Sequence, residues 1–191
     1  MLVTDGSDLL ALAMATLTLT CVGDDRPGLV SALSAPISAH GASWERSQMA
    51  HLAGKFAGVL QVEVADERAD ALVGDLTALK DVGLSVVVER TDAPVPQPAL
   101  RLNLELLGAD HPGIVAEISA ALAQQGIGIE ELSTDLREAP MAGGLLFEAH
   151  AVLAAPLTTS MDELSRKLEA IANSLMVDIK LSDAASADTA P

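Results

Sequence analysis

Gly23-Asp24-Asp25-Arg26-Pro27-Gly28-Leu29-Val30 returns later in the chain as Gly108-Ala109-Asp110-His111-Pro112-Gly113-Ile114-Val115. Gly28 and Gly113 lie 85 positions apart (113 − 28), and Gly41 and Gly126 keep the same spacing. A repeat of this length indicates two copies of a small domain rather than a solenoid of short units. In each copy the phrase follows an alternating strand pattern and opens a helical one, so it marks a strand-to-helix turn.

The residues around the first phrase predict one complete unit. Apolar residues alternate at Leu17, Leu19 and Cys21, which predicts a strand. They then recur at helical spacing at Leu29, Leu33 and Ile37, which predicts a helix. Strands at 43–49 and 56–64, a helix at 66–80 and a strand at 84–88 follow. Asp25 is the predicted N-cap of the first helix, and Pro27 suits its first turn. Pro36 lies inside that helix, where it removes a hydrogen bond and favours a bend.

The second phrase predicts the same order of elements. Leu102, Leu104 and Leu106 alternate along its first strand, and its first helix ends at Gly126. Strands at 127–137 and 145–153 form a hairpin, and a helix at 161–175 precedes a strand at 177–181. Each unit is therefore βαββαβ. We predict an α+β protein of two ferredoxin-like domains, each an antiparallel four-stranded sheet with two helices on one face.

Composition divides the chain into five segments. We expect a lead-in at 1–15 with a helical turn at 8–12, a first domain at 16–92 and a second at 100–183. The segment 93–99 holds Pro94, Pro96 and Pro98, which favours a semi-rigid linker. The small, polar tail at 184–191 is typical of disorder.

Charge and residue usage exclude several function classes. A formal net charge of −16 offers no basic face for phosphates, so direct nucleic-acid binding is not expected. Cys21 is the only cysteine, which rules out an intrachain disulfide and favours a small buried side chain. The four histidines lack the close spacing of a helical metal site, and no cofactor or metal is predicted. No basic leader or membrane span is evident, so we predict a cytoplasmic protein.

The repeated turn has the chemistry of a small binding site. The first turn of a helix leaves backbone N–H groups unpaired, and the helix dipole favours negative charge there. A carboxylate could bind those groups while Asp24, Asp25 or Asp110 meets an amino group, which suits a free amino acid. Alternatively, Asp, Pro and Gly merely start a helix.

The turn resembles the opening of an ACT domain, with Gly41 or Gly126 a dozen residues later and then Trp44-Glu45 or Ile129-Glu130. Two such domains without a catalytic domain are similar to the glycine cleavage system transcriptional repressor family. The hairpin of that family also resembles the stretch Ser47-Gln48-Met49-Ala50-His51-Leu52-Ala53-Gly54-Lys55-Phe56 of this chain. ACT domains are regulatory modules that bind amino acids where the first strand-helix turn meets a neighbouring domain. The resemblance implies a ligand site at Asp24, Asp25, Arg26, Pro27, Gly28 and Leu29, and at Asp110, His111, Pro112, Gly113 and Ile114.

The predicted function is therefore a non-enzymatic amino-acid sensor. Glycine or serine is the expected ligand, and the resemblance implies transcriptional regulation through a protein partner. Open sheet edges favour a homodimer. The alternative is a small enzyme of acylphosphatase-like type, which would use Arg26 to hold phosphate; Asp24 and Asp25 beside it disfavour that reading.

Overall fold

The computed structural model describes residues 13–91, 99–138 and 144–183. The chain divides into two compact units, residues 1–95 and 96–191. The predicted turn at 8–12, most of the predicted linker, Pro140 and Gly143 of the second hairpin loop, and the tail from Ala184 lie outside the described residues.

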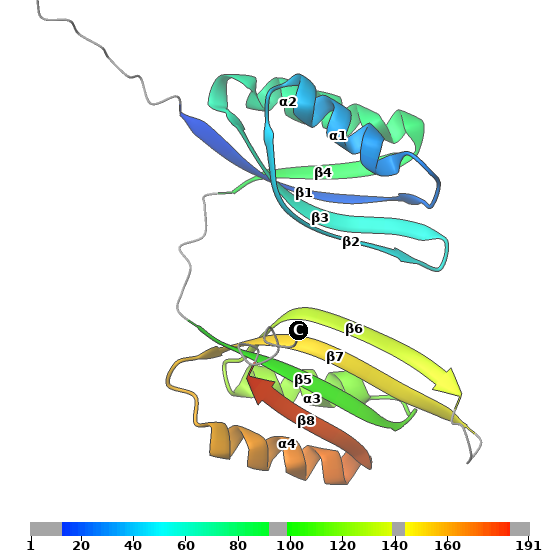
Figure 1. Cartoon of the computed structure of the whole chain (residues 1–191), viewed down its shortest axis with the longest axis vertical. Coiled ribbons are helices and arrows are strands. Elements are labelled where there is room, and N and C mark those ends of the chain that lie inside the picture. The colour runs from blue at the N-terminus through cyan, green and yellow to red at the C-terminus, as the bar shows by residue number, and fades with distance from the viewer. Residues whose placement is uncertain (1–12, 92–98, 139–143, 184–191) are drawn as a thin grey trace, which may run out of the picture. The chain divides into compact units, whose positions relative to one another are not determined.

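In the first unit, β1 (Met14–Asp24) leads into α1 (Leu29–Ala39) and then into the hairpin of β2 (Ser43–Leu52) and β3 (Lys55–Ala65). Next come α2 (Asp66–Ala78), the short 3-10 helix η1 (Leu79–Val82) and β4 (Leu84–Arg90). The strands pair antiparallel in the order β2-β3-β1-β4 (Figure 1). The strand β1 begins at Met14 rather than Leu17, because Met14 already pairs with Ala65.

The second unit repeats this plan. Its elements are β5 (Ala99–Ala109), α3 (Ile114–Gln124), β6 (Gly128–Glu138), β7 (Leu145–Pro156), α4 (Met161–Leu175) and β8 (Val177–Asp183). The strands pair antiparallel in the order β6-β7-β5-β8. The prediction of two α+β units of βαββαβ order is thereby confirmed.

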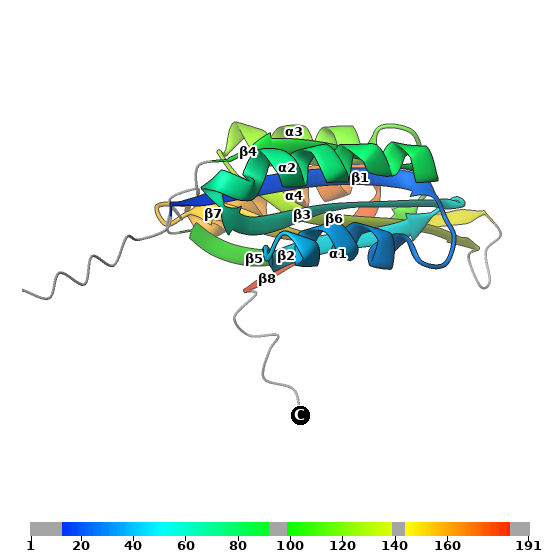
Figure 2. The ribbon, with the colours of Figure 1, turned by 90° about the horizontal axis from the view of Figure 1, so that it is seen from above.

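Each sheet carries both of its helices on one face, so the other face is open. Figure 2 shows α1 and α2 side by side along the first sheet. Alternation along the strands sends one set of side chains under the helices. That set includes Leu17, Leu19 and Cys21 from β1 and Leu60, Val62 and Val64 from β3, all buried as predicted. Burial also raises the pKa of the Cys21 thiol.

The glycine that opens each repeated phrase lies where two strands approach closely. A Cβ at Gly23 would lie 2.6 Å from the carbonyl oxygen of Gly83, and one at Gly108 would lie 2.4 Å from a methyl carbon of Val177. Neither distance is tolerable, so both positions require glycine. These contacts fix the end of β1 against β4, and of β5 against β8, just before each turn begins.

The edge strand β6 is exposed along its whole length. It pairs with β7 on one side only, so its other side presents unpaired backbone groups. Across the described residues, no helix is both long enough and apolar enough to cross a membrane.

Candidate functional site

The first repeated turn is held by backbone contacts rather than by a side-chain cap. Gly28 is the N-cap of α1, with φ 94°, and its carbonyl accepts the first helical bond from Ala32 N at 2.8 Å. The prediction that Asp25 caps this helix is wrong, and Pro27 precedes the helix instead of lying in its first turn. The left-handed backbone of Gly28 explains this, because the chain needs the turn Pro27-Gly28 before it can enter the helix. Asp25 N donates instead to Gly54 O in the β2–β3 hairpin at 2.9 Å.

The second turn has the same backbone geometry. Gly113 is the N-cap of α3 with φ 105°, and Glu117 N donates to its carbonyl at 2.9 Å. Asp110 N donates to Leu145 O of β7 at 2.9 Å, as Asp25 N does to the first hairpin. In both units the turn is thus tied to the neighbouring hairpin by the amide of the equivalent aspartate.

The residue before each Pro-Gly pair binds the far end of the second helical segment. The Arg26 guanidinium donates to the carbonyl oxygen of Val82, the last residue of η1. The half-buried His111 ring places Nε2 3.1 Å from Leu175 O at the end of α4, and Nδ1 3.2 Å from Pro112 O. A neutral imidazole carries hydrogen on only one nitrogen, so one contact at a time is a hydrogen bond. Both side chains therefore clamp the turn to its own unit.

The acidic residues of the first turn have basic neighbours from the hairpin. Asp24 forms an ion pair with Lys55, which holds the pKa of the Asp24 carboxyl below its ordinary value. Asp25 lies 3.5 Å from His51 Nε2 and remains 42% exposed. Within the described ranges, the Asp110 side chain has no ion-pair partner.

Sequence reasoning missed His51 and Lys55 as members of this cluster. The signal was present, because a tight turn at Ala53-Gly54 places Lys55 opposite Asp24 once β1 and β3 pair antiparallel. Leu29 and Ile114, by contrast, were predicted as ligand contacts but lie in the two cores, 3% and 2% exposed. Asp24, Asp25, Arg26, Pro27 and Gly28 are all exposed together at one end of the first unit.

The two turns differ in the charge at their helix N-termini. The amides of Leu29, Val30 and Ser31 precede the first helical bond of α1 and have no side-chain cap. Among the four described α-helices, α1 alone has no acidic residue in its first turn, whereas α3 has Glu117. In α4, Ser160 accepts from Glu163 N and so caps the helix. The first turn of α1 therefore offsets the helix dipole less than the first turn of α3 does.

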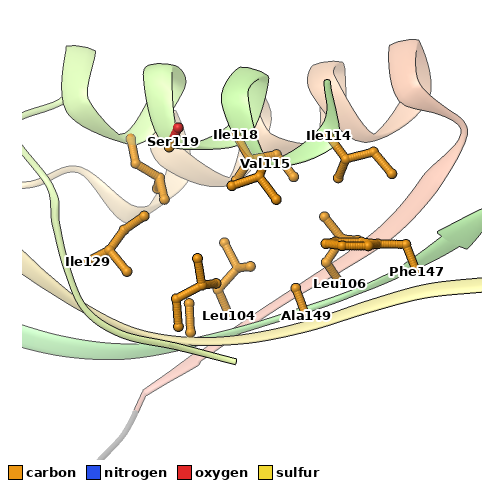
Figure 3. A pocket seen from close by; sticks show the side chains of 12 residues that line it. Leu104, Leu106, Ile114, Val115, Ile118, Ser119, Ile129, Phe147 and Ala149 are labelled. Atoms are coloured by element: carbon orange, nitrogen blue, oxygen red, sulfur yellow. The ribbon is translucent and has the colours of Figure 1, made fainter. Parts of the chain in front are cut away.

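An apolar pocket lies below α3 in the second unit. Figure 3 shows Ile114, Val115 and Ile118 pointing from the helix toward Leu104, Leu106 and Ala149 of the sheet. The cavity has a volume of about 30 Å³. Val115 and Leu132 of its lining are 44% and 48% exposed, so it reaches the surface beside β6.

Three positions of the second sheet carry smaller side chains than their equivalents in the first, and two of them, Ile129 and Ala151, line this pocket. The register places Ile129, Thr134 and Ala151 where the first unit has Trp44, Met49 and Leu60. Leu60 is buried, and Trp44 and Met49 pack partly buried against the first core. Within residues 13–91, 99–138 and 144–183, no cluster of three or more His, Cys, Asp or Glu side chains could hold a metal ion.

Known proteins share this fold. A solved structure of an unknown protein from Galdieria sulphuraria aligns with a TM-score of 0.80 at 28% identity, covering 90% of this chain and 99% of that one. A protein provisionally described as a glycine cleavage system transcriptional repressor aligns with a TM-score of 0.66 at 19% identity, covering 88% and 96%. Fold and repeated turns thus define a tandem ferredoxin-like protein.

Sequence comparison narrows the class of protein further. A family model described as an ACT domain matches residues 15–89. The glycine cleavage system transcriptional repressor of Escherichia coli is 28% identical over 119 residues, which cover 61% of this chain and 62% of the repressor. The match therefore spans less than two thirds of that relative. A UPF0237 protein of Methanopyrus kandleri is 32% identical over 84 residues, covering 41% of this chain and 91% of that protein. Residues 15–89 therefore belong to the ACT domain family, and the second unit repeats the same fold in tandem.

Proposed function

We propose that this protein is a non-enzymatic amino-acid sensor whose working site is the first repeated turn. The observation that carries the proposal is the N-terminus of α1, where three amides are unpaired and the first helical turn contains no acidic residue. A ligand carboxylate would accept hydrogen bonds from those amides. The turn of the second unit is the weaker candidate, because Glu117 lies in the first turn of α3.

A carboxylate beside the same turn fits the ligand's ammonium group. Asp25 is exposed, and its contact with His51 is long at 3.5 Å, so an ammonium group could replace the imidazole. Asp24 is already paired with Lys55. Asp25 is therefore the residue that we assign to the ammonium group, and a small amino acid such as glycine or serine suits the open, exposed turn.

We further propose that the sensor regulates transcription through a protein partner. The Escherichia coli relative is a transcriptional repressor by name, and the present chain has a net charge of −16, which disfavours direct contact with DNA. Amino-acid binding acts as a signal only if the ligand prefers one of two states of the protein. The acylphosphatase-like alternative depends on Arg26, whose guanidinium here donates to Val82 O.

Calorimetric titration of the full chain with the common amino acids tests the site. We expect saturable binding of one small amino acid, weakened at least tenfold by Asp25→Asn because the ammonium loses its charged partner. The matched variant Asp110→Asn changes the equivalent residue of the second turn and should bind as the wild type does. Absence of saturable heat with every amino acid would contradict the sensor. Loss of binding in Asp110→Asn alone would show that the first turn is the wrong one.

A further inference from the structure

The open face of the first sheet carries an uncharged patch across all four strands. Two adjacent rows of cross-strand neighbours form it, Gln48-Val59-Thr20-Val87 and Ala50-Ala57-Val22-Ser85. All eight side chains are exposed, with Val22, Val59 and Val87 at 47%, 43% and 57%. We call these residues the uncharged patch.

The second sheet is charged at the equivalent positions. Its two rows are Ser133-His150-Glu105-Lys180 and Asp135-Glu148-Leu107-Asp178. Six of these eight residues, all but Ser133 and Asp135, line a hollow of about 320 Å³. Glu148 also pairs with Arg137 at 2.9 Å. An antiparallel sheet that faces water on one side normally carries polar residues there. The second sheet carries charged residues at most of these positions and the first sheet carries none, so the fold itself does not require the uncharged patch.

Charged residues border the uncharged patch in complementary places. The next row toward one end is Arg46-Gln61-Thr18-Glu89, with Arg46 on one edge strand and Glu89 on the other. They are three strand spacings apart, roughly 14 Å, too far to pair within one sheet. Neither has an ion-pair partner among the described residues. Lys55 and Asp24 stand opposite one another just beyond the other end.

We propose that the uncharged patch binds the same patch of a second copy of this chain, about a two-fold axis parallel to the strands and between β1 and β3. This axis exchanges β2 with β4 and β3 with β1, so it keeps each row opposite itself. Arg46 then faces Glu89 of the second copy, and Lys55 faces Asp24 of the second copy. The uncharged rows meet in the middle, where small and β-branched side chains suit face-to-face sheet packing.

Charge and area both favour this occupant. Two chains of net charge −16 repel each other, so they associate most readily where the contact brings no like charges together. A four-stranded sheet with strands of this length presents roughly 600 Å². Two copies would bury about 1,200 Å², the lower end of specific interfaces, so a weak dimer is expected. The proposal is independent of amino-acid binding.

Sedimentation velocity of the full chain over a range of concentrations tests it at low salt. We expect a reversible dimer in the wild type and at least tenfold weaker association in Thr20→Glu, because the interface would bury an unpaired carboxylate. Glu105 occupies the equivalent place on the second sheet, so the fold accepts this side chain. The matched control Glu105→Thr should associate as the wild type does, and circular dichroism checks that each variant is folded.

A charge-reversal experiment tests the position of the proposed two-fold axis. Arg46→Glu and Glu89→Arg should each weaken the dimer, and the double variant should restore it, because the pair between copies is re-formed with its signs reversed. Monomeric wild type at the highest concentration, or a Thr20→Glu variant that dimerises normally, would overturn the proposal. So would failure of the double variant to recover, or sensitivity to Glu105→Thr in place of Thr20→Glu.

Discussion

The two units share one backbone fold but differ in the volume of their core side chains and in the charge of their exposed residues. Beneath the first helix, the second unit has Ile129, Thr134 and Ala151 at the positions equivalent to Trp44, Met49 and Leu60 of the first unit, and its core retains a cavity. In contrast, both units have a glycine at the close approach that opens the phrase, Gly23 and Gly108, and a left-handed glycine before the first helix, Gly28 and Gly113. Backbone geometry at the turn is therefore demanded by the fold, whereas side-chain volume and surface charge are free to diverge.

The largest expected effect concerns the volume beneath the first helix of each unit. Leu60→Ala should lower the free energy of unfolding of the first unit by about 2–4 kcal/mol, because it leaves a cavity in a filled core. Trp44 is the only tryptophan, so its fluorescence follows the first unit during denaturant unfolding.

The reverse change, from a small to a larger side chain, can be made at the equivalent position of the second unit. Ala151→Val places two methyl groups beside an existing cavity, so we expect the stability to stay within about 1 kcal/mol of the wild type, measured by circular dichroism. A loss as large as that of Leu60→Ala would mean that the second core is as tightly filled as the first.

A smaller effect is expected at the glycine that opens the phrase. Gly23→Ala should destabilise the first unit by about 1–3 kcal/mol, because its Cβ meets the backbone carbonyl of Gly83, which no side-chain rotation can move. The control is Gly74→Ala in α2, where nothing lies within 4 Å of the new Cβ. That change should stabilise the helix by about 0.5–1 kcal/mol. Equal unfolding midpoints for the two variants would refute the close-approach explanation.

The smallest effect is electrostatic. Because pairing with Lys55 lowers the pKa of Asp24 in the folded state, its contribution to stability is present above the ordinary carboxyl range, near pH ~4, and is lost as the pH falls through the lowered value. Lys55→Gln should return the Asp24 pKa toward its ordinary value in an NMR titration of the side-chain carboxyl. An unchanged titration curve would show that the ion pair does not persist in solution.

The fold was predictable from sequence because its signals are local. Periodic apolar residues and the glycines and prolines of the repeated turn predict each strand and helix. Short connections leave few ways to arrange these elements. The N-cap was mispredicted because Asp25 suits a cap by residue type, while the left-handed turn at Gly28 delays the helix until Leu29. Sequence reasoning had no access to that backbone angle.

The surroundings of the candidate site depend on register and were not predicted. Lys55 and His51 approach the first turn only because β1 pairs with β3 in a register that places Asp24 opposite Lys55. The contacts of Arg26 and His111 join residues 56 and 64 positions apart, through the end of a helix whose last residue cannot be placed by periodicity alone. Whether Asp24, Asp25 and the second turn bind a ligand stays a prediction for the titrations above.

The fully exposed strand β6 also bears on how concentrated solutions of this protein behave. An edge of this length could template the growth of a cross-β fibril from partly unfolded chains. Its four acidic side chains and one arginine, Glu130, Glu131, Asp135, Glu138 and Arg137, place like charges in register along any such stack. Salt screens the repulsion between these like charges. Storage at high ionic strength should therefore shorten the lag before aggregation, and dilute buffer should lengthen it.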